Sequence, residues 1–239
     1  MDTTNTLPRM SVCMPALNEE KTLRAAVEDL RSQLSPRLSW LEIIIVNDGS
    51  TDSTPLCAQE LAKEFAGIKV IHHQRRIGVG SCYRDALAVA EGDYYTWFPA
   101  DHENAAVELV HCLQYLRPDV VVTSHHKGCD PRMLRRKVVS AIYTRLLNSL
   151  FGFKVTYYNG LTIFPLRVLR SFELVSDGFV FQAEAMIRAL RSGCRLIELQ
   201  APLKERTWGK SKAFTLSSLV HAGGDALRII RSMHARRMR

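Results

Sequence analysis

The sequence predicts an α/β fold in which a Rossmann-like, mostly parallel sheet carries helices on both faces. Short apolar runs alternate with longer segments whose apolar residues recur at helical spacing, which is typical of parallel strands joined by helices. Three of the apolar runs end in carboxylates, within residues 15–20, within residues 46–52 and at Asp101. The carboxyl ends of parallel strands meet at one edge of a sheet, where ligands bind in such folds. We therefore expect these three groups of side chains to form one site.

The expected strands are the apolar runs. Residues 41–46 are almost continuously apolar, as in a parallel strand that is buried on both faces. Pro15 is expected to end the first strand, and residues 156–164 are expected to form a strand or a hairpin. The other expected strands cover residues 12–14, 69–72, 94–98, 120–123 and 195–199.

Helices are expected between the strands. The first helical segment repeats apolar residues every three or four positions. Asp52 or Ser53 suits the N-cap of the second helix, and Gly193 suits the end of the last one in this region. The expected helices cover residues 20–34, 53–65, 81–90, 105–116, 132–150 and 181–192.

One domain is expected, because no internal repeat or low-complexity linker interrupts the chain. We assign residues 1–213 to this domain, with a polar loop over residues 204–212. Residues 214–239 are expected to form a basic, amphipathic C-terminal helix or tail, although Gly223 and Gly224 weaken a helix there.

The composition excludes several classes of protein. The chain has 239 residues, 46% of them hydrophobic and 23% charged, which is ordinary for a globular domain with a core. It contains no run of about 18 apolar residues, and its first six residues do not resemble a signal peptide. Its six cysteines are scattered without a CxxC pair, which favours reduced, buried thiols in a cytosolic protein over a zinc site. We thus expect a cytoplasmic protein without a transmembrane helix.

Two pairs of adjacent histidines could suggest metal ligands. They are His72-His73 and His125-His126. Neighbouring residues on a strand face opposite ways, so we interpret all four as surface or loop histidines rather than as metal ligands.

Positive charge is concentrated at the C-terminal end of the sequence. The formal net charge is +8. Residues 204–239 contain nine Lys or Arg and two acids, so they carry +7 of this excess. Such a block suits an anionic partner, which is a phosphate, a membrane surface or nucleic acid; the alternative is a solvated helix face with a basic tail. No nucleic-acid recognition motif is present and aromatic residues are not interleaved with the basic ones, so nucleic acid is the least favoured partner.

The order of short motifs resembles the inverting family 2 glycosyltransferases of the GT-A fold. Each motif alone is also an ordinary turn or loop. A narrower similarity to the dolichyl- and polyprenyl-phosphate sugar transferases rests on residues 80–84, 181–184 and 206–212. The family motifs, in order, are Pro15-x-x-Asn18-Glu19, Asn47-Asp48-Gly49-Ser50-x-Asp52, Gly78-x-Gly80-x-x-Tyr83-Arg84, Ala90-Glu91-Gly92-Asp93 and the strand that ends at Asp101.

The resemblance implies a nucleoside-diphosphate sugar, with UDP or GDP, as donor. Asp48 would accept hydrogen bonds from the base or the ribose. For Asn18 and Glu19 the alternative role is capping of the following helix. The residues expected to bind the nucleotide sugar are Pro15, Asn18, Glu19, Asp48, Gly78, Gly80, Arg84, Ala100 and Asp101.

The resemblance also implies Mg²⁺ or Mn²⁺, held by carboxylate oxygens beside the diphosphate. Asp101 is the expected ligand, but the usual Asp-x-Asp motif reads Pro99-Ala100-Asp101 here. Glu103 either completes the metal site or merely begins the next helix. Two further departures from the family are Thr156, where relatives often carry aspartate, and Arg76, where asparagine is common.

The acceptor decides whether a catalytic base is needed. A hydroxyl requires one, and the candidates are Asp177 and Glu184, although Glu184 would also suit a buried structural carboxylate. A lipid phosphate is already ionised and requires cations that hold it beside the donor. Together with Asp101, these two acids are the expected catalytic residues. The residues expected to bind the acceptor phosphate are Arg135, Arg136, Gln182, Arg206, Ser211 and Lys212.

The favoured function is therefore an inverting, metal-dependent hexosyl transfer from a nucleotide sugar to a polyprenyl phosphate or related lipid. The enzyme would lie at the inner face of the membrane, with its basic C-terminal segment on anionic lipid. The alternative is transfer to a hydroxyl of a glycolipid or polysaccharide. A non-catalytic nucleic-acid-binding protein is less favoured, and a nucleotidyltransferase would require a glycine-rich, lysine-containing phosphate loop that we do not find.

Overall fold

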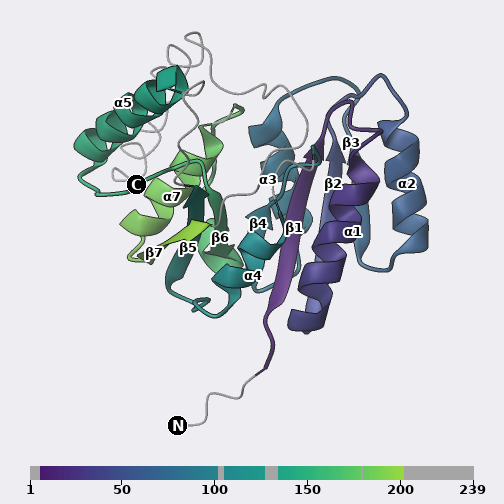
Figure 1. The fold of residues 1–239 in the computed structure, drawn as a ribbon, viewed down its shortest axis with the longest axis horizontal. Coiled ribbons are helices and arrows are strands. Elements are labelled where there is room, and N and C mark those ends of the chain that lie inside the picture. Colours follow the sequence, from purple (N-terminus) through teal and green to yellow (C-terminus); the bar gives the residue numbers. More distant parts are fainter. Residues whose placement is uncertain (1–5, 102–104, 127–133, 179, 202–239) are drawn as a thin grey trace.

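Seven strands form one sheet in the computed structural model of the chain, which describes residues 6–101, 105–126, 134–178 and 180–201 (Figure 1). The strands are β1 (Arg9–Ala16), β2 (Trp40–Asn47), β3 (Ile68–His72), β4 (Tyr94–Trp97), β5 (Val120–His126), β6 (Leu161–Pro165) and β7 (Arg195–Ala201). The helices are α1 (Leu23–Leu34), the short 3₁₀ helix η1 (Ser35–Arg37), α2 (Thr54–Glu64), α3 (Val79–Val89), α4 (Val107–Leu113), α5 (Leu134–Phe151), α6 (Leu166–Leu169) and α7 (Phe181–Arg191).

The predicted fold is confirmed, and one strand breaks the parallel pattern. The strand order is β3-β2-β1-β4-β6-β5-β7. Strands β1, β2, β3 and β4 pair in parallel, as do β5 and β7, whereas β6 is antiparallel to both β4 and β5. The carboxyl ends of β1, β2 and β4 consequently meet at one edge of the sheet.

Two hydrophobic cores cover the two faces of the sheet. In β2, Ile43 and Ile45 belong to one core, whereas Ile44 and Val46 belong to the other, as the alternation of a strand requires. Helices α1, α2 and α4 contribute to the first core, and α3, α5 and α7 to the second. Figure 1 shows α1 in front of the sheet and α3 behind it. Both cores bury apolar area, which stabilises the fold by about 25 cal/mol per Å² removed from water.

The prediction that Pro15 ends the first strand is wrong. β1 continues to Ala16, and Pro15 is in register with Val46 of β2. Cys13 accepts a hydrogen bond from the Phe98 N–H on the β4 side. Residues two apart on a strand direct their backbone groups to the same side, so the Pro15 nitrogen also faces β4, beyond the end of that strand. The missing N–H of proline therefore costs no ladder hydrogen bond.

The expected helix and strand positions otherwise agree with the structure to within a few residues. The first helix begins at Leu23 rather than at residue 20, because residues 17–20 form a loop that is bound to the next one. The short helix α6 was not expected. The expected loop over residues 204–212 and the helix or tail over residues 214–239 lie outside the described residues.

Two glycines at the start of α3 allow a close approach of backbones. Gly78 has a φ of 108°, and a Cβ on it would lie 2.6 Å from the carbonyl oxygen of Asp177. A Cβ on Gly80 would lie 2.2 Å from the carbonyl oxygen of Ser176, while its own N–H donates to the Asp177 carbonyl at 2.8 Å. The Gly-x-Gly motif thus holds α3 against residues 176–177.

We predict that Gly80→Ala destabilises the protein. In an unconstrained helix this change is stabilising by about 0.5–1 kcal/mol. Here the added methyl group meets backbone atoms, so we expect a loss of roughly 1–3 kcal/mol, as for other overpacked sites. Urea denaturation measures the difference. A gain in stability would contradict the close contact.

Candidate active site

Two loops at the carboxyl edge of the sheet are joined by hydrogen bonds. The N–H of Thr51 donates to Asn18 Oδ1 at 2.9 Å, and the N–H of Asn18 donates to Ser50 Oγ at 3.0 Å. The N–H of Glu19 donates to Thr54 Oγ1 at 2.8 Å. Asn18 has a φ of 57°, a left-handed conformation that asparagine tolerates. The loop after β1 is thereby fixed to the loop after β2.

Both loops also begin helices. The Glu19 carbonyl accepts hydrogen bonds from the N–H groups of Thr22 and Leu23. Asp52 Oδ1 accepts one from the N–H of Thr54 at 3.0 Å, at the start of α2. The prediction of Asp52 as a cap is confirmed in this sense, although the residue at the N-cap position itself is Ser53.

Asp48 is the most completely enclosed carboxylate of this edge. Its residue is 5% exposed, and it accepts hydrogen bonds from the N–H of Ile77 at 2.8 Å, the N–H of Gly78 at 3.0 Å and His73 Nδ1 at 3.0 Å. Burial alone raises the pKa of the Asp48 carboxyl, but these three hydrogen bonds outweigh burial and hold the pKa below its usual value. Asp48 is therefore an ionised, oriented acceptor at neutral pH.

His73 lies between two carboxylates. Its Nδ1 is 3.0 Å from Asp48 Oδ1, and its Nε2 is 3.0 Å from Asp85 Oδ2 on α3. Of the two alternatives expected for His73, a surface or a loop histidine, the loop is confirmed, because His73 directly follows β3 and its side chain is only 9% exposed. Its neighbour His72 is exposed, as expected.

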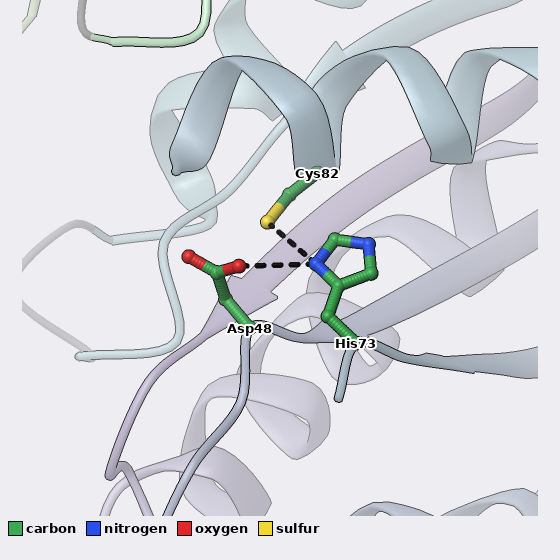
Figure 2. Close-up of side chains that lie close together, drawn as sticks. All are labelled: Asp48, His73 and Cys82. Carbon is green, nitrogen blue, oxygen red and sulfur yellow. Dashed lines mark hydrogen bonds and ion pairs between the residues drawn. The ribbon is translucent and has the colours of Figure 1, made fainter. Parts of the chain in front are cut away.

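Asp48, His73 and Cys82 form a compact cluster (Figure 2). Each offers an atom that can bind a metal, and these atoms lie within 4.8 Å of one another. The cluster does not suit Mg²⁺ or Mn²⁺, which prefer oxygen ligands. Burial raises the pKa of the Cys82 thiol, so the thiolate is disfavoured, and the hydrogen bonds of Asp48 already occupy His73 Nδ1. We interpret the cluster as a hydrogen-bonded support of Asp48.

Asp101 lies beyond the end of β4, at the same edge of the sheet. Trp97, the last residue of β4, is in register with Cys13 of β1, and Ala16 of β1 is in register with Asn47 of β2. The chain after each of these strands therefore emerges beside the others. Ala100 is buried in the core and can offer a ligand only its backbone, whereas Asp101 is partly exposed. A partly exposed carboxylate at this edge of the sheet suits a hard divalent cation. Glu103 lies outside the described residues.

Arg84 connects α3 to the loop before α7. Its guanidinium donates to the Ser176 carbonyl at 2.6 Å and to Ser81 Oγ at 3.0 Å, and it forms an ion pair with Asp177. The Asp177 side chain is 57% exposed. These contacts place Asp177, a predicted base, beside the Gly-x-Gly motif.

Glu184 is fully buried, and both oxygens of its carboxylate accept hydrogen bonds. It accepts hydrogen bonds from the N–H of Val175 at 3.0 Å, the N–H of Ser176 at 2.9 Å and Arg188 Nε at 2.8 Å. This arrangement favours the structural alternative over the role of a base. Gln182, in the first turn of the same helix, is 4% exposed, and within the described part of the chain nothing donates to its Oε1.

The remaining predicted residues cannot be placed by their side chains. Arg135 and Arg136 belong to α5, but only their backbone is described. Arg206, Ser211 and Lys212 lie outside the described residues. Pro15 lies at the end of β1, beside the loops of the site.

A cavity of about 1240 Å³ lies at the opposite edge of the sheet. It is lined by the starts of β1 and β4 and by several arginines, among them Arg117 and Arg170. Arg117 donates to the carbonyls of Gln114 and Leu116, and Arg170 to that of Ala90. These guanidinium groups bind carbonyls just beyond the ends of α4 and α3, so we place the candidate site at the carboxyl edge, where Asp48 and Asp101 lie.

A mostly parallel sheet with carboxylates at the ends of its central strands defines an α/β protein. A family model, "Glycosyl transferase family 2", matches residues 11–175. The chain therefore belongs to glycosyl transferase family 2.

The curated relatives are longer than this chain. It is 28% identical over 237 residues to glycosyltransferase AglD of Haloferax volcanii, covering 92% of the chain and 36% of that protein. It is also 28% identical over 190 residues to the low-salt glycan biosynthesis hexosyltransferase Agl6 of the same organism, covering 76% of the chain and 44% of that protein. The chain thus spans less than half the length of these relatives.

Solved structures confirm the GT-A fold. Glucosyl-3-phosphoglycerate synthase from Mycobacterium tuberculosis, in complex with Mn²⁺, UDP and glucosyl-3-phosphoglycerate, superposes with a TM-score of 0.63. The match covers 96% of this chain and 80% of that one at 19% identity. The same enzyme with Mn²⁺, UDP-glucose and phosphoglyceric acid also gives a TM-score of 0.63, with 96% and 79% coverage and 19% identity.

We predict that Glu184→Gln affects folding more than chemistry. The change removes the negative charge that compensates the buried Arg188, and breaking a buried ion pair costs about 3–5 kcal/mol. Thermal and urea denaturation should report this loss, while the pH dependence of kcat for the folded fraction stays that of the unchanged protein. A stable but inactive Glu184→Gln variant would instead identify Glu184 as a base.

Proposed function

We propose that the chain is a glycosyltransferase that moves a sugar from a nucleoside-diphosphate sugar to a polyprenyl phosphate or a related lipid phosphate, with inversion. The observation that carries this proposal is the ionised Asp48, fixed by three donors at the carboxyl edge of the sheet. The family membership and the glycan-biosynthesis description of Agl6 support the same reaction class.

The donor would bind across the ends of β1, β2 and β4. Asp48 would accept a hydrogen bond from the base or the ribose, and the backbone near Pro15 and Gly78 would line the donor site. Asp101 would hold Mg²⁺ or Mn²⁺, with Glu103 as a second ligand. When bound, the cation offsets the negative charge of the departing diphosphate. The solved neighbours bind UDP together with Mn²⁺ or Mg²⁺, which supports this assignment.

The transfer is a single displacement. An oxygen of the acceptor phosphate forms a bond to the anomeric carbon from the face opposite the leaving group, and the bond from that carbon to the donor phosphate oxygen breaks. The electron pair leaves with the nucleoside diphosphate, so no proton needs to be removed from the acceptor. The burial of Glu184 and the ion pair of Asp177 with Arg84 favour an acceptor of this kind over a hydroxyl.

Transfer to a hydroxyl of a glycolipid or polysaccharide is the second candidate. The observation that favours it is the exposed carboxylate of Asp177 beside Gly80. In that case Asp177 would remove the proton of the attacking hydroxyl. Activity on a soluble acceptor that depends on an ionised carboxylate would support this candidate.

An apolar stripe on α5 supports a membrane location. Four apolar residues follow one another at intervals of four positions, and each of them is about half exposed: Val138, Ile142, Leu146 and Leu150. The adjacent side of the helix packs into the core through Tyr143, Leu147 and Phe151. Helix α5 has no acidic residue and contains four basic ones. An apolar stripe flanked by cations is typical of a helix that lies in the surface of an anionic bilayer.

We therefore propose that α5 and the basic C-terminal segment hold the enzyme at the inner face of an anionic membrane. Within the part of the chain that the structure describes, no helix combines the length and the apolar character needed to cross a bilayer. Gln182, whose buried Oε1 accepts no hydrogen bond from the described residues, and the arginines at the start of α5 would bind the acceptor headgroup.

We predict that Asp48→Ala abolishes tight binding of the donor. The change removes the charged group that accepts a hydrogen bond from the nucleotide base. The Kd for UDP- or GDP-sugars should therefore rise at least about tenfold. Calorimetric titration in the presence of Mn²⁺ measures this change. Asp119→Ala is a matched control, because Asp119 is an exposed carboxylate paired with Arg195 away from the site. Equal binding by Asp48→Ala and the unchanged protein would refute the donor site.

We predict that the double substitution Ile142→Ser and Leu146→Ser weakens binding to vesicles of anionic lipid. Removing two apolar contacts should lower the partition coefficient by more than about tenfold, since each buried CH₂ contributes about 0.8 kcal/mol. Flotation with anionic vesicles that contain about 30% phosphatidylserine measures the change. Leu56→Ser is the control, because Leu56 is 63% exposed on α2. Unchanged flotation of the double variant would exclude α5 as the membrane contact.

A further inference from the structure

A chain of hydrogen bonds runs from the protein surface to the buried carboxylate of the site. It begins at Asp85 on α3, passes through both ring nitrogens of His73 and ends at Asp48, with 3.0 Å at each step. The side chain of Asp85 is 48% exposed, whereas those of His73 and Asp48 are 9% and 7% exposed. Figure 2 shows the inner part of this chain, with His73 Nδ1 directed at Asp48.

We propose that His73 is a positioning residue for the nucleotide base, and that Asp85 anchors it. His73 holds Asp48 in the orientation in which it accepts a hydrogen bond from a ring N–H of the base. This inference rests on the proposed function, since it requires a nucleoside-diphosphate donor.

The hydrogen-bond chemistry of the three side chains fixes their roles. The ionised Asp48 carboxylate only accepts hydrogen bonds, so Nδ1 of His73 donates to it. Hydrogen bonds to a charged group are about twice as strong as neutral ones. The other ring nitrogen, Nε2, lies 3.0 Å from Asp85 Oδ2, so Asp85 holds the ring on one side and the ring holds Asp48 on the other.

The remaining acceptor capacity of Asp48 is directional. Its Oδ1 receives His73 Nδ1 and the Ile77 N–H, whereas its Oδ2 receives the Gly78 N–H. Each carboxylate oxygen has two lone-pair positions. By this count Oδ2 keeps one position for a ligand, and the three donors prevent the carboxylate from turning.

Such a carboxylate distinguishes between bases. Uracil and guanine carry a hydrogen on the ring nitrogen of the base-pairing edge, which Asp48 can accept. Cytosine and adenine carry a lone pair there, which would face the negative charge. A site built for a donor rejects a ligand without one, because its own buried polar group is then left unpaired. The cluster therefore predicts a preference for UDP and GDP over CDP and ADP.

Cys82 completes the cluster without competing for Asp48. Its sulfur lies 4.0 Å from His73 Nδ1. Burial raises the pKa of this thiol, so it remains neutral at pH 7. It thus encloses the ring without adding a second charge.

Substitution of the anchor tests this proposal with little risk to the fold, because Asp85 is exposed. We expect Asp85→Asn to raise the Kd for UDP or GDP about three- to tenfold, and His73→Gln more than about tenfold. In both variants the ratio of the Kd for CDP to the Kd for UDP should be smaller than in the unchanged protein. The kcat at saturating donor should stay near that of the unchanged protein. Asp119→Asn is the matched control, since Asp119 is 55% exposed and also forms an ion pair, with Arg195 at 3.1 Å. A merely structural role would lower the melting temperature and leave the ratio of UDP to CDP affinities unchanged, and that result would overturn the proposal.

A second readout does not depend on the nucleotide. Nitrogen NMR of the histidines should show a hydrogen on Nδ1 of His73, assigned by the loss of this signal in His73→Gln, and the signal should shift in Asp85→Asn. A His73 ring without a hydrogen on Nδ1 would overturn the positioning role even if nucleotides bind. A His73 ring with this hydrogen, in a protein that binds none of UDP, GDP, CDP or ADP, would instead refute the proposed function and leave the hydrogen bond to Asp48 intact.

Discussion

The burial of one ionised carboxylate organises this site. Asp48 lies in a largely water-excluded position, where an unpaired charge would cost several kcal/mol. Two backbone N–H groups and a histidine compensate that charge. The segment between β3 and α3 must therefore fold over the end of β2, because it supplies all three donors. The geometry of the loop and the charge of the side chain are thus interdependent.

The glycines of the site follow from the same constraint. The loop that covers Asp48 turns at Gly78, whose φ of 108° is unfavourable for other residues. It then enters α3 at Gly80, where the backbone of residues 176–177 leaves no room for a Cβ. Gly49 has a φ of 71°, and a Cβ on it would lie 2.5 Å from the backbone of Arg75 and Arg76. Each of the first three family motifs therefore contacts another one, which explains why their order carries more information than any single motif.

The sequence sufficed to predict the parallel α/β architecture, because it depends on local patterns that a single sequence displays. It did not predict the antiparallel insertion of β6, since strand order is decided by contacts between distant segments. It also did not reveal that the side chain of His73 is largely buried. The alternation of a strand describes residues within it, and His73 is the first residue after β3. The spacing of Cys82 and Asp85 on one face of α3 was the available signal for the cluster, but their partner on another element cannot be read from spacing. Buried Glu184 was open to two roles because its partners, Val175, Ser176 and Arg188, become apparent only in three dimensions.

We propose above all that the nucleoside diphosphate binds at the carboxyl edge, with its base at Asp48 and its diphosphate near Asp101. A crystal structure of the chain with Mn²⁺ and UDP or GDP tests this proposal most directly. We expect a ring N–H of the base within hydrogen-bond distance of Asp48 Oδ2 and Mn²⁺ bound to Asp101. A nucleotide in the cavity at the opposite edge of the sheet, or a base that leaves Asp48 without contact, would contradict it.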